Sequence, residues 1–315
     1  ALGLEDIPSP EPAAGEVRIR GEATTVNFAD ILVCQGIYQD RPGVPLTPGT
    51  ESCGIIQAAG PGVDLAIGTR VAGMTNMKHG GFAEEALVKA ATALVMSDDL
   101  EAADATVLYS TFQTAHVGLF HRCNLEAGDW VVILGASSGV GAAAVQLATA
   151  RGARVIATAG GEAKQAHCRT LGAEITVDST GDGAADALYE AAMQATDGAG
   201  VSVAFDPVGG PLGEVTRRLM GFEGQLVVIG FTSGSIPSYP ANHVLVKNYT
   251  VHGMAWAEYA ARRRSVIETA HVDLLDLFRQ GRIRTDVETI ALDALPEALA
   301  ALEARTVTGR LALVP

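Results

Sequence analysis

Hydrophobic and polar positions follow two different periods along this chain. Up to about residue 105, short segments alternate between apolar and polar side chains, as in Glu16-Val17-Arg18-Ile19-Arg20. Turn signals interrupt these segments, at Pro42-Gly43, Pro48-Gly49 and Gly60-Pro61-Gly62. Because an alternation of period two is typical of strands with one buried face, this part of the chain predicts an irregular β domain.

From about residue 108 to residue 252, unbroken apolar runs alternate with helical patterns. Buried strands of a parallel sheet have this appearance, since helices cover both faces of such a sheet. A helical stretch follows Met254, and a closing strand is expected at 310–314. We therefore expect an α/β chain with a doubly wound parallel sheet. Its strands are predicted at residues 130–134, 154–158, 202–206, 225–230 and 249–253.

The first of these runs ends in a glycine-rich turn that opens directly into a helix. Gly135, Gly139 and Gly141 fall in the turn, and the small residues 141–144 begin the helix. Glycine permits a sharp bend and a close approach of backbone N–H groups to an anion, and a helix N-terminus adds partial positive charge. The pattern favours a site for the pyrophosphate of a dinucleotide.

Other interpretations fit the same glycine-rich residues. The same glycine spacing occurs in short-chain dehydrogenases, but none of the six tyrosines has the lysine of that family's dyad four positions later. Residues 135–139 also match a hydrolase nucleophile elbow, with Ser137 as nucleophile and Asp206 and His252 downstream. A glycine turn that binds nothing is the third possibility. The additional Val140-Gly141 favours nucleotide binding over the elbow.

Composition narrows the functional classes. The chain has 315 residues, which suits two domains or one large one. A net charge of −14 and a pI near 4.9 argue against nucleic acid or an anionic membrane as partner. The four cysteines and seven histidines are scattered, without the close pairs of a disulfide framework or a metal site. With no apolar run of membrane-spanning length, we expect a cytoplasmic protein with reduced, mostly buried thiols.

The end of the second predicted strand bears on the choice of cofactor. NAD-binding units usually place an acidic residue there, where it binds the ribose hydroxyls. Here the strand ends in Thr158-Ala159-Gly160-Gly161, and Lys164 follows shortly afterwards. A pocket without the acid accepts a 2′-phosphate, with which Lys164 can pair. NADP (NADPH) is therefore the predicted cofactor, while an inward-pointing Glu162 or a solvated Lys164 would argue against it.

Several short motifs are spread along the chain. They are Asn27-Phe28-Ala29-Asp30, Gln35-Gly36-Ile37-Tyr38, Pro48-Gly49-Thr50-Glu51, Gly81-Phe82-Ala83-Glu84, the glycine turn, Asp206-Pro207-Val208-Gly209-Gly210 and Lys247-Asn248-Tyr249-Thr250-Val251. In this order they resemble the medium-chain dehydrogenase/reductase superfamily, in its zinc-free quinone oxidoreductase (zeta-crystallin-like) branch. The resemblance implies a GroES-like catalytic domain at 1–107 and 253–315, with a Rossmann domain inserted at 108–252. It also implies a homodimer, paired through the sheet edge at residues 248–254.

The resemblance has consequences for metal chemistry. At the positions where alcohol dehydrogenases of this superfamily hold catalytic zinc, it aligns Asn27 and Thr50, and neither is a competent ligand. The four-cysteine lobe that binds structural zinc is absent from the sequence. Without a Lewis acid an alkoxide is poorly stabilised, so alcohol oxidation is not expected. What the resemblance implies is an NADPH-dependent transfer of hydride to a quinone or a related electron-poor carbonyl acceptor.

The resemblance also assigns residues to the cofactor. Ser138 stands where many members have glycine, and its hydroxyl can donate a hydrogen bond. Arg305 matches a basic residue near the adenosine phosphate, although an exposed arginine at a helix end is an equal interpretation. The remaining positions are Gly139, Val140 and Gly141 at the pyrophosphate, Val208 and Gly209 along the ribose, and Thr114 with the Gly230, Phe231 and Ser233 loop beside the nicotinamide.

Asn27 and Tyr38 are the substrate-side candidates, with Phe231 as a pocket wall. In the related enoyl reductases a tyrosine in the context of Tyr38 is a proposed proton donor. Reduction of a conjugated alkene needs hydride at one carbon and a proton at its neighbour, whereas a reduced quinone takes its protons from water. Tyr38 is thus either the catalytic acid or an aromatic wall. Asn27 is either a substrate-binding amide or a satisfied turn asparagine.

Three functions stay open on these grounds. The leading one is a quinone reductase, the second an enoyl or 2-alkenal reductase with Tyr38 as proton donor, and the third a non-catalytic relative that binds NADPH. Asn27, Tyr38 and Thr114 beside an intact glycine turn favour an enzyme, since a binding protein would not need the substrate-side set. The chain starts at Ala1 without an initiator Met, so we expect a trimmed protein or a segment of a larger polypeptide such as a polyketide synthase.

Overall fold

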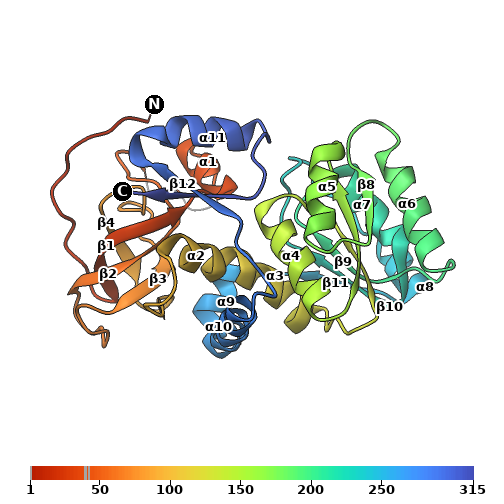
Figure 1. Ribbon diagram of the computed structural model, residues 1–315, viewed down its shortest axis with the longest axis horizontal. Helices are drawn as coiled ribbons and strands as arrows, with labels where there is room; N and C mark the ends of the chain where they lie inside the picture. The colour runs from red at the N-terminus through yellow and green to blue at the C-terminus, as the bar shows by residue number, and fades with distance from the viewer. Residues whose placement is uncertain (1, 39–40, 42) are drawn as a thin grey trace. The chain divides into compact units, whose positions relative to one another are not determined.

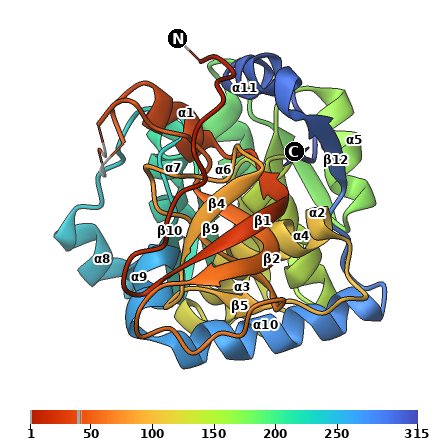
Figure 2. The same ribbon diagram turned by 90° about the vertical axis from the view of Figure 1, so that its left-hand side faces the viewer.

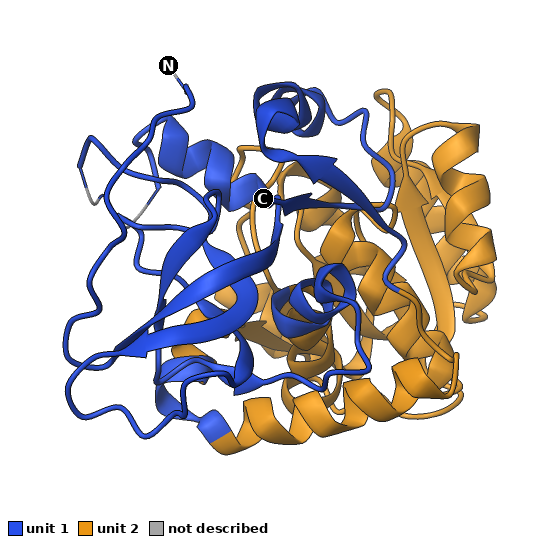
Figure 3. Cartoon of the chain, turned by 60° about the vertical axis from the view of Figure 1, so that its left-hand side comes forward, with its two compact units in different colours: residues 1–110, 260–264, 285–315 blue, residues 111–259, 265–284 orange. Residues whose placement is uncertain are grey.

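The internal contacts of the chain divide it into two units, shown in blue and orange in Figure 3. This computed structural model describes residues 2–38, 41 and 43–315. Unit 1 comprises residues 1–110, 260–264 and 285–315, and unit 2 comprises residues 111–259 and 265–284. Both chain ends therefore fall in unit 1, whereas the glycine-rich turn falls in unit 2.

Unit 1 contains a seven-stranded sheet in the order β12-β13-β1-β2-β3-β5, with β4 paired to β1 (Figure 2). Most pairs are antiparallel, and the predicted alternation is visible in β1, where Val17 and Ile19 are fully buried. The elements are β1 (Glu16–Thr25), α1 (Phe28–Cys34), β2 (Glu51–Ala59), β3 (Arg70–Met74), β4 (Glu85–Lys89), β5 (Leu94–Val95), α2 (Ala102–Val107), β12 (Val287–Ala291), the 3₁₀ turn η3 (Leu292–Ala294), α11 (Leu295–Glu303) and β13 (Arg310–Val314).

Unit 2 contains a six-stranded, all-parallel sheet in the order β11-β10-β9-β6-β7-β8. The strands are β6 (Trp130–Ile133), β7 (Arg154–Ala159), β8 (Ile175–Asp178), β9 (Val201–Asp206), β10 (Met220–Val228) and β11 (Thr250–Gly253). This is the strand order of a doubly wound dinucleotide-binding fold, and it confirms the predicted fold class. The sequence pattern missed β8, which is short and lies at the edge of the sheet.

Helices connect the parallel strands of unit 2 and cover both faces of the sheet, α4 and α5 on one side and α6 and α7 on the other (Figure 1). The helices are α3 (Gln113–His116), α4 (Gly139–Ala150), α5 (Glu162–Thr170), α6 (Ala184–Ala195), α7 (Gly210–Leu219), α8 (Ala241–Lys247), α9 (Trp256–Arg262) and α10 (Arg264–Arg279). Between them lies a core of β-branched and leucine side chains, including Val132, Ile156 and Leu226, all fully buried.

Most of α10 lies with unit 2, although the predicted division gave residues 253–315 to the domain of the chain ends. Two contacts account for this. Asp273 of α10 accepts from the Arg151 guanidinium at the end of α4, and its other oxygen lies 2.8 Å from Nε2 of His116. Burial lowers the pKa of His116 more than Asp273 raises it, so this is a hydrogen bond to a neutral ring near pH 7.

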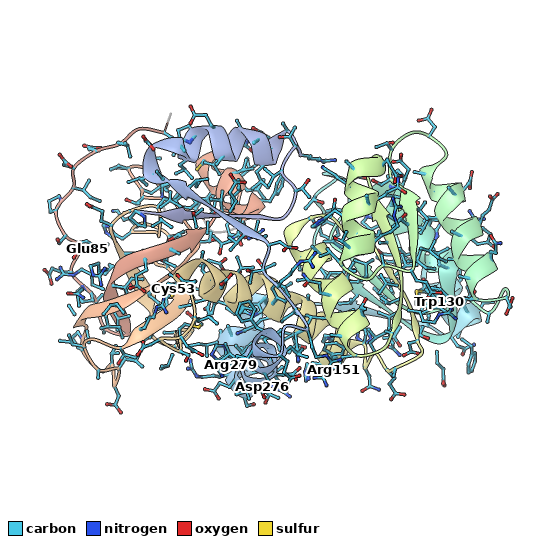
Figure 4. All side chains as sticks on the ribbon, in the orientation of Figure 1. Cys53, Glu85, Trp130, Arg151, Asp276 and Arg279 are labelled. Atoms are coloured by element: carbon cyan, nitrogen blue, oxygen red, sulfur yellow. The ribbon has the colours of Figure 1, made fainter. Side chains whose placement is uncertain are left out.

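The four cysteines are all free, as the sequence predicts. Cys53, which Figure 4 labels in β2, is buried, as are Cys123 and Cys168, while Cys34 is exposed. Burial raises the pKa of the Cys53 and Cys123 thiols to about 12, so both are inert at neutral pH. Among the described residues, no helix combines the length and the apolar character that crossing a membrane requires.

Candidate functional site

The glycine turn, residues 135–141, connects the carboxyl end of β6 to the N-terminus of α4. Gly135 has a φ of +58°, which a residue with a side chain adopts only with strain. A Cβ at Gly141 would lie 2.3 Å from the carbonyl oxygen of Gly135, so no side chain fits there. The first helical bond of α4 runs from the Ala142 N–H to the Ser138 carbonyl, which leaves the N–H groups of residues 139–141 at the open end of the helix.

Ser138 has a different role from the one expected of it. Its hydroxyl donates to the carbonyl of Gly135 at 2.6 Å, and its backbone N–H donates to the same oxygen at 2.9 Å. The hydroxyl therefore closes the turn. The turn is also fastened to β7, because the hydroxyl of Thr158 accepts from the N–H of Gly135 at 3.1 Å.

Two further loops meet the glycine turn at the carboxyl ends of β9 and β10. A Cβ at Gly135 would lie 2.9 Å from Val208, which places the loop after β9 directly against the turn. The loop after β10 is joined to it by a bond from the Ser233 N–H to the Val208 carbonyl at 2.9 Å. The structure thus brings together the predicted residues Ser138, Gly139, Val140, Gly141, Val208, Gly209, Gly230, Phe231 and Ser233. They lie at the topological switch point between the neighbouring strands β6 and β9, where sheets of this topology bind ligands.

Asp206 holds the loop after β9 in place. One oxygen of its fully buried carboxylate accepts from the N–H groups of Val208 and Gly209, at 2.8 and 2.7 Å. Burial raises the pKa of Asp206, and these hydrogen bonds oppose the rise. Gly209 has a φ of +69°, and a Cβ there would lie 2.6 Å from the carbonyl oxygen of Ser235, so the loop backbone is closely packed.

The turn after β7 carries Gly161, and Lys164 lies in the first turn of the helix that follows, α5. Gly161 has a φ of +76°, and a Cβ there would meet no atom within 4 Å, so open space adjoins the turn. The Asp178 carboxylate fixes the turn by accepting from the Gly161 N–H at 3.1 Å, and the hydrogen bonds it accepts lower its pKa. Glu162 pairs with Arg169 of the same helix, so its charge is balanced along α5.

Thr114 lies in α3, a four-residue α-helical segment between two π-helical ones. These are η1 (Leu108–Phe112) and η2 (Val117–Arg122). Such π-helical turns are rare and often occur at functional sites. Thr114 itself is half-buried, whereas the neighbouring Gln113 is fully buried and accepts a hydrogen bond from the Trp256 indole at 3.1 Å.

Unit 1 contains a second group of interacting polar side chains, which we call the polar cluster: Asn27, Asp30, Glu51 and Arg310. Asn27 stands just before α1 and donates from Nδ2 to Oε1 of Glu51 at 3.0 Å. Its Oδ1 accepts from Nη2 of Arg310 at 2.5 Å. Asp30 accepts from the backbone N–H groups of Asn27 and Thr50, at 2.8 and 2.9 Å.

Burial dominates the electrostatics of the polar cluster. Asp30 is fully buried, which raises its pKa to about 7 although two backbone hydrogen bonds oppose the rise. Burial likewise raises the pKa of Glu51, against hydrogen bonds from Ser110 and Asn27 and the charge of Arg310. Burial lowers the pKa of Arg310, but arginine is not deprotonated in proteins, so the guanidinium stays charged at neutral pH.

The other predicted residues of unit 1 lie outside the polar cluster. Tyr38 is half-buried and follows α1, where its backbone N–H donates to Leu32 at 3.1 Å. Arg305 is exposed just after α11 and has a φ of +58°. An arginine in the left-handed region is uncommon, and here it marks the end of the helix.

The three residues of the hydrolase interpretation do not assemble. The Asp206 carboxylate accepts hydrogen bonds from the backbone of the loop after β9. Nε2 of His252 lies 2.5 Å from Oε1 of Gln225. Ser137 is buried in the turn and forms no hydrogen bond with either side chain among the described residues. A nucleophile without a base in reach cannot be activated, so this arrangement is not a hydrolytic triad.

Comparison with known proteins identifies the family. Residues 13–98 match the model of the alcohol dehydrogenase GroES-like domain, and residues 139–271 match that of the zinc-binding dehydrogenase. A quinone oxidoreductase-like protein 2 homolog from Nematostella vectensis is 32% identical over 302 residues, which cover 95% of this chain and 81% of the relative. The chain belongs to the medium-chain dehydrogenase/reductase superfamily, in its quinone oxidoreductase branch.

Solved structures of this superfamily show the same fold. The quinone oxidoreductase from Thermus thermophilus, also solved in complex with NADPH, has a TM-score of 0.82 and 29% identity, over 100% of this chain and 96% of that one. A mycobacterial protein solved with NADPH has a TM-score of 0.89 and 26% identity, over 99% of this chain and 94% of that one. The resemblance inferred from the motifs is thereby confirmed.

Although one matching superfamily model is described as zinc-binding, the polar cluster does not fit a zinc ion. Of its four members, Asn27 already uses its oxygen to accept from the Arg310 guanidinium. The fixed charge of Arg310 within the cluster repels a second cation, and zinc prefers thiolate and imidazole ligands that are absent there. Within residues 2–38, 41 and 43–315, no group of three or more His, Cys, Asp and Glu side chains is placed to hold a metal ion.

Three members of the polar cluster, Asp30, Glu51 and Arg310, were missed as site residues by the sequence interpretation. Asp30 had a local signal, since an acid three residues after an asparagine is typical of a helix start. Arg310 had none, because its partner Asn27 is 283 residues away in the chain. Only the pairing of β1 with β13 brings them together.

Proposed function

We propose that this chain is a zinc-independent, NADPH-dependent reductase that transfers hydride to a quinone or a related electron-poor carbonyl acceptor. The observation that carries the proposal is the glycine turn, where a Cβ at Gly141 would overlap the backbone of Gly135. Such a turn leaves room for a pyrophosphate against the first N–H groups of α4. The relatives solved with NADPH support the same cofactor.

The residues of the chain hold the cofactor at three places in this proposal. The N–H groups of Gly139, Val140 and Gly141 bind the pyrophosphate. Gly161 gives the adenosine ribose room, and Lys164 pairs with the 2′-phosphate. Thr114, Phe231 and Ser233 contact the nicotinamide, and Arg305 the adenosine phosphate. NADPH, when bound, supplies a hydride and leaves as NADP⁺, while water supplies the proton that completes the hydroquinone.

On the substrate side, Asn27 donates a hydrogen bond to the acceptor oxygen. Its Nδ2 carries two hydrogens, of which one is given to Glu51. The other is available for an oxygen on which negative charge develops as the carbonyl group is reduced. Donors fixed in advance toward such an oxygen stabilise the transition state, because they need no reorganisation.

A second substrate class is suggested by Tyr38, a half-buried phenol that follows α1. If its hydroxyl donates a proton to the α-carbon while hydride reaches the β-carbon, the acceptor is an enoyl thioester or a 2-alkenal. If Tyr38 is an aromatic wall, a quinone is sufficient. The two classes differ in whether they need the phenolic hydroxyl.

The test is the oxidation of NADPH by the purified chain with 1,4-benzoquinone or crotonyl-CoA, with NADH as the cofactor control. Turnover of the quinone, unaffected by Tyr38→Phe, is the expected result. Turnover of crotonyl-CoA that is lost in Tyr38→Phe would establish the second class. NADPH binding without turnover of any acceptor would overturn the proposal in favour of a non-catalytic relative.

We also propose a homodimer formed through the free edge of the parallel sheet at β11. Large apolar side chains are exposed on neighbouring β10 and α8, with Phe222 76%, Leu245 75% and Val246 78% accessible. Surfaces of this kind often mark a protein contact. Light scattering after size exclusion should give a dimer that Val246→Glu converts to a monomer, and a monomeric parent protein would refute this.

A further inference from the structure

Arg310 lies directly opposite Asn27, the residue that precedes α1. Strands β1 and β13 run antiparallel, with Thr25 facing Ala312, and the N–H of Val26 donates to the carbonyl of Leu311 at 2.9 Å. Continuing this register by one further pair places Asn27 opposite Arg310, where the two side chains meet. The contact is therefore fixed by the sheet.

The hydrogen bonds leave the Asn27 amide only one orientation. Arg310 can only donate, so the atom that it contacts must be the amide oxygen. The atom 3.0 Å from Oε1 of Glu51 must then be the amide nitrogen. A flipped amide would place a donor against the guanidinium and an acceptor against the carboxyl group, which would break both bonds.

One hydrogen of the amide nitrogen remains after these bonds are made. Among the described residues, the side-chain amide of Asn27 forms hydrogen bonds to no side chains besides those of Glu51 and Arg310. The charge of Arg310 also polarises the amide through its oxygen, which makes the remaining N–H a stronger donor. Glu51 and Asp30 balance that charge within unit 1, since both act on Arg310 electrostatically.

We propose that Arg310 is a positioning residue, which holds the Asn27 amide so that its free N–H stabilises the negative charge developing on the acceptor oxygen. This rests on the proposed reductase function. Arg310 acts through Asn27 and does not contact the substrate. Arg310 therefore stabilises the transition state more than the bound substrate, because the negative charge on the acceptor oxygen is larger in the transition state.

The test compares kcat for 1,4-benzoquinone, expressed per NADPH-binding site counted by fluorescence titration, in the parent protein, Arg310→Gln and Arg310→Lys. In Arg310→Gln we expect kcat to fall about tenfold with the NADPH affinity unchanged, since the Asn27 donor loses its preorganisation. Arg310→Lys keeps a cation and a donor, and should lose only about threefold by the same argument. Arg20→Gln removes an exposed arginine of β1 and should leave kcat unchanged.

A double-mutant cycle with Asn27→Ala separates positioning from a structural role. If Arg310 acts through Asn27, neither substitution at 310 lowers kcat further once Asn27 is alanine. An equal loss in both backgrounds, or an unchanged kcat per site in Arg310→Gln, would overturn the inference. If Arg310→Gln does not fold, the same cycle with Arg310→Lys decides. A parent protein that binds NADPH but reduces no acceptor would instead refute the proposed function, and this inference with it.

Discussion

The glycine turn and the polar cluster are built in opposite ways. The turn is a single stretch of seven positions, made of backbone and almost without charge, and its geometry depends on the absence of side chains at Gly135 and Gly141. The cluster is made of side chains brought together from three separate segments, and it depends on balancing buried charges. The turn can hold an anion through its backbone N–H groups alone, whereas the polar cluster can act only through its side chains.

The largest effect should come from adding a methyl group to the turn. In Gly141→Ala the new Cβ meets the Gly135 carbonyl, a backbone atom that cannot move aside. We expect a loss on the order of 3 kcal/mol in unfolding free energy or, if the turn opens instead, about 100-fold in NADPH affinity. Urea unfolding and fluorescence titration measure the two quantities.

The matched control is Gly183→Ala, also in unit 2, where a Cβ would meet nothing within 4 Å and φ is not positive. It should change the unfolding free energy by less than about 0.5 kcal/mol. If Gly141→Ala behaved like this control, the turn would not be the closely packed backbone that we describe.

The polar cluster should respond to pH where the turn does not. The folded-state pKa of Asp30, about 7, lies above its ordinary value of 3.8. The stability that this shift contributes is therefore complete below about pH 4 and is lost as pH rises through 7, by up to about 1.4 kcal/mol per pH unit. Asp30→Asn cannot titrate, so in urea unfolding its stability relative to the parent should improve between about pH 5 and pH 7. Parallel pH curves for the two proteins would show that Asp30 does not titrate in this way.

A smaller effect is expected at the loop after β9, where unit 2 does use a buried charge. Asp206→Ala leaves the Val208 and Gly209 N–H groups without their acceptor, at a cost of about 2 kcal/mol in unfolding free energy. Asp206→Asn keeps an oxygen in that place and should lose less than half as much. Thermal unfolding of both variants tests this, and equal losses would mean that the charge matters more than the acceptor.

The smallest effect should come from Lys164, a half-buried cation in the first turn of α5, next to Gly161. Lys164→Gln is expected to weaken NADPH binding about threefold to fivefold, the usual value of an ion pair near the protein surface, and to leave NADH binding unchanged. The control is Arg169→Gln on the same helix, because that guanidinium is engaged by Glu162. Equal weakening of NADPH and NADH by Lys164→Gln would assign the 2′-phosphate to another residue.

The same contrast explains what could be predicted from the sequence. The parallel sheet and its glycine turn were predictable because each is a local pattern: an apolar run, then glycines, then a helix, as in residues 130–144. The meeting of Val208 with Gly135 followed from topology, since the carboxyl ends of neighbouring parallel strands lie at one edge.

The polar cluster was only half predictable. Asn27 was recognised from its motif, but its partner Arg310 belongs to a strand whose pairing cannot be inferred from spacing. The inward role of the Ser138 hydroxyl was also hidden, because a serine in a turn can bond to a ligand or to its own backbone equally well. Interactions between distant segments, and choices between two acceptors for one donor, are the parts that a sequence pattern does not determine.

The pairing of β1 with β13 also affects the order in which the two halves of the chain can fold during synthesis. Glu51 and Arg310 both form hydrogen bonds with the Asn27 side chain. During synthesis at about 5–20 residues per second, Glu51 is added to the chain roughly 10 to 50 seconds before Arg310. Throughout that interval the nascent β domain has two carboxyl groups to bury and no guanidinium to balance them, whereas all strands of the parallel sheet, within residues 130–253, are synthesised before Arg310 is reached. The nucleotide-binding half can therefore mature first on the ribosome, and the substrate-side half is completed only once β13 has been translated.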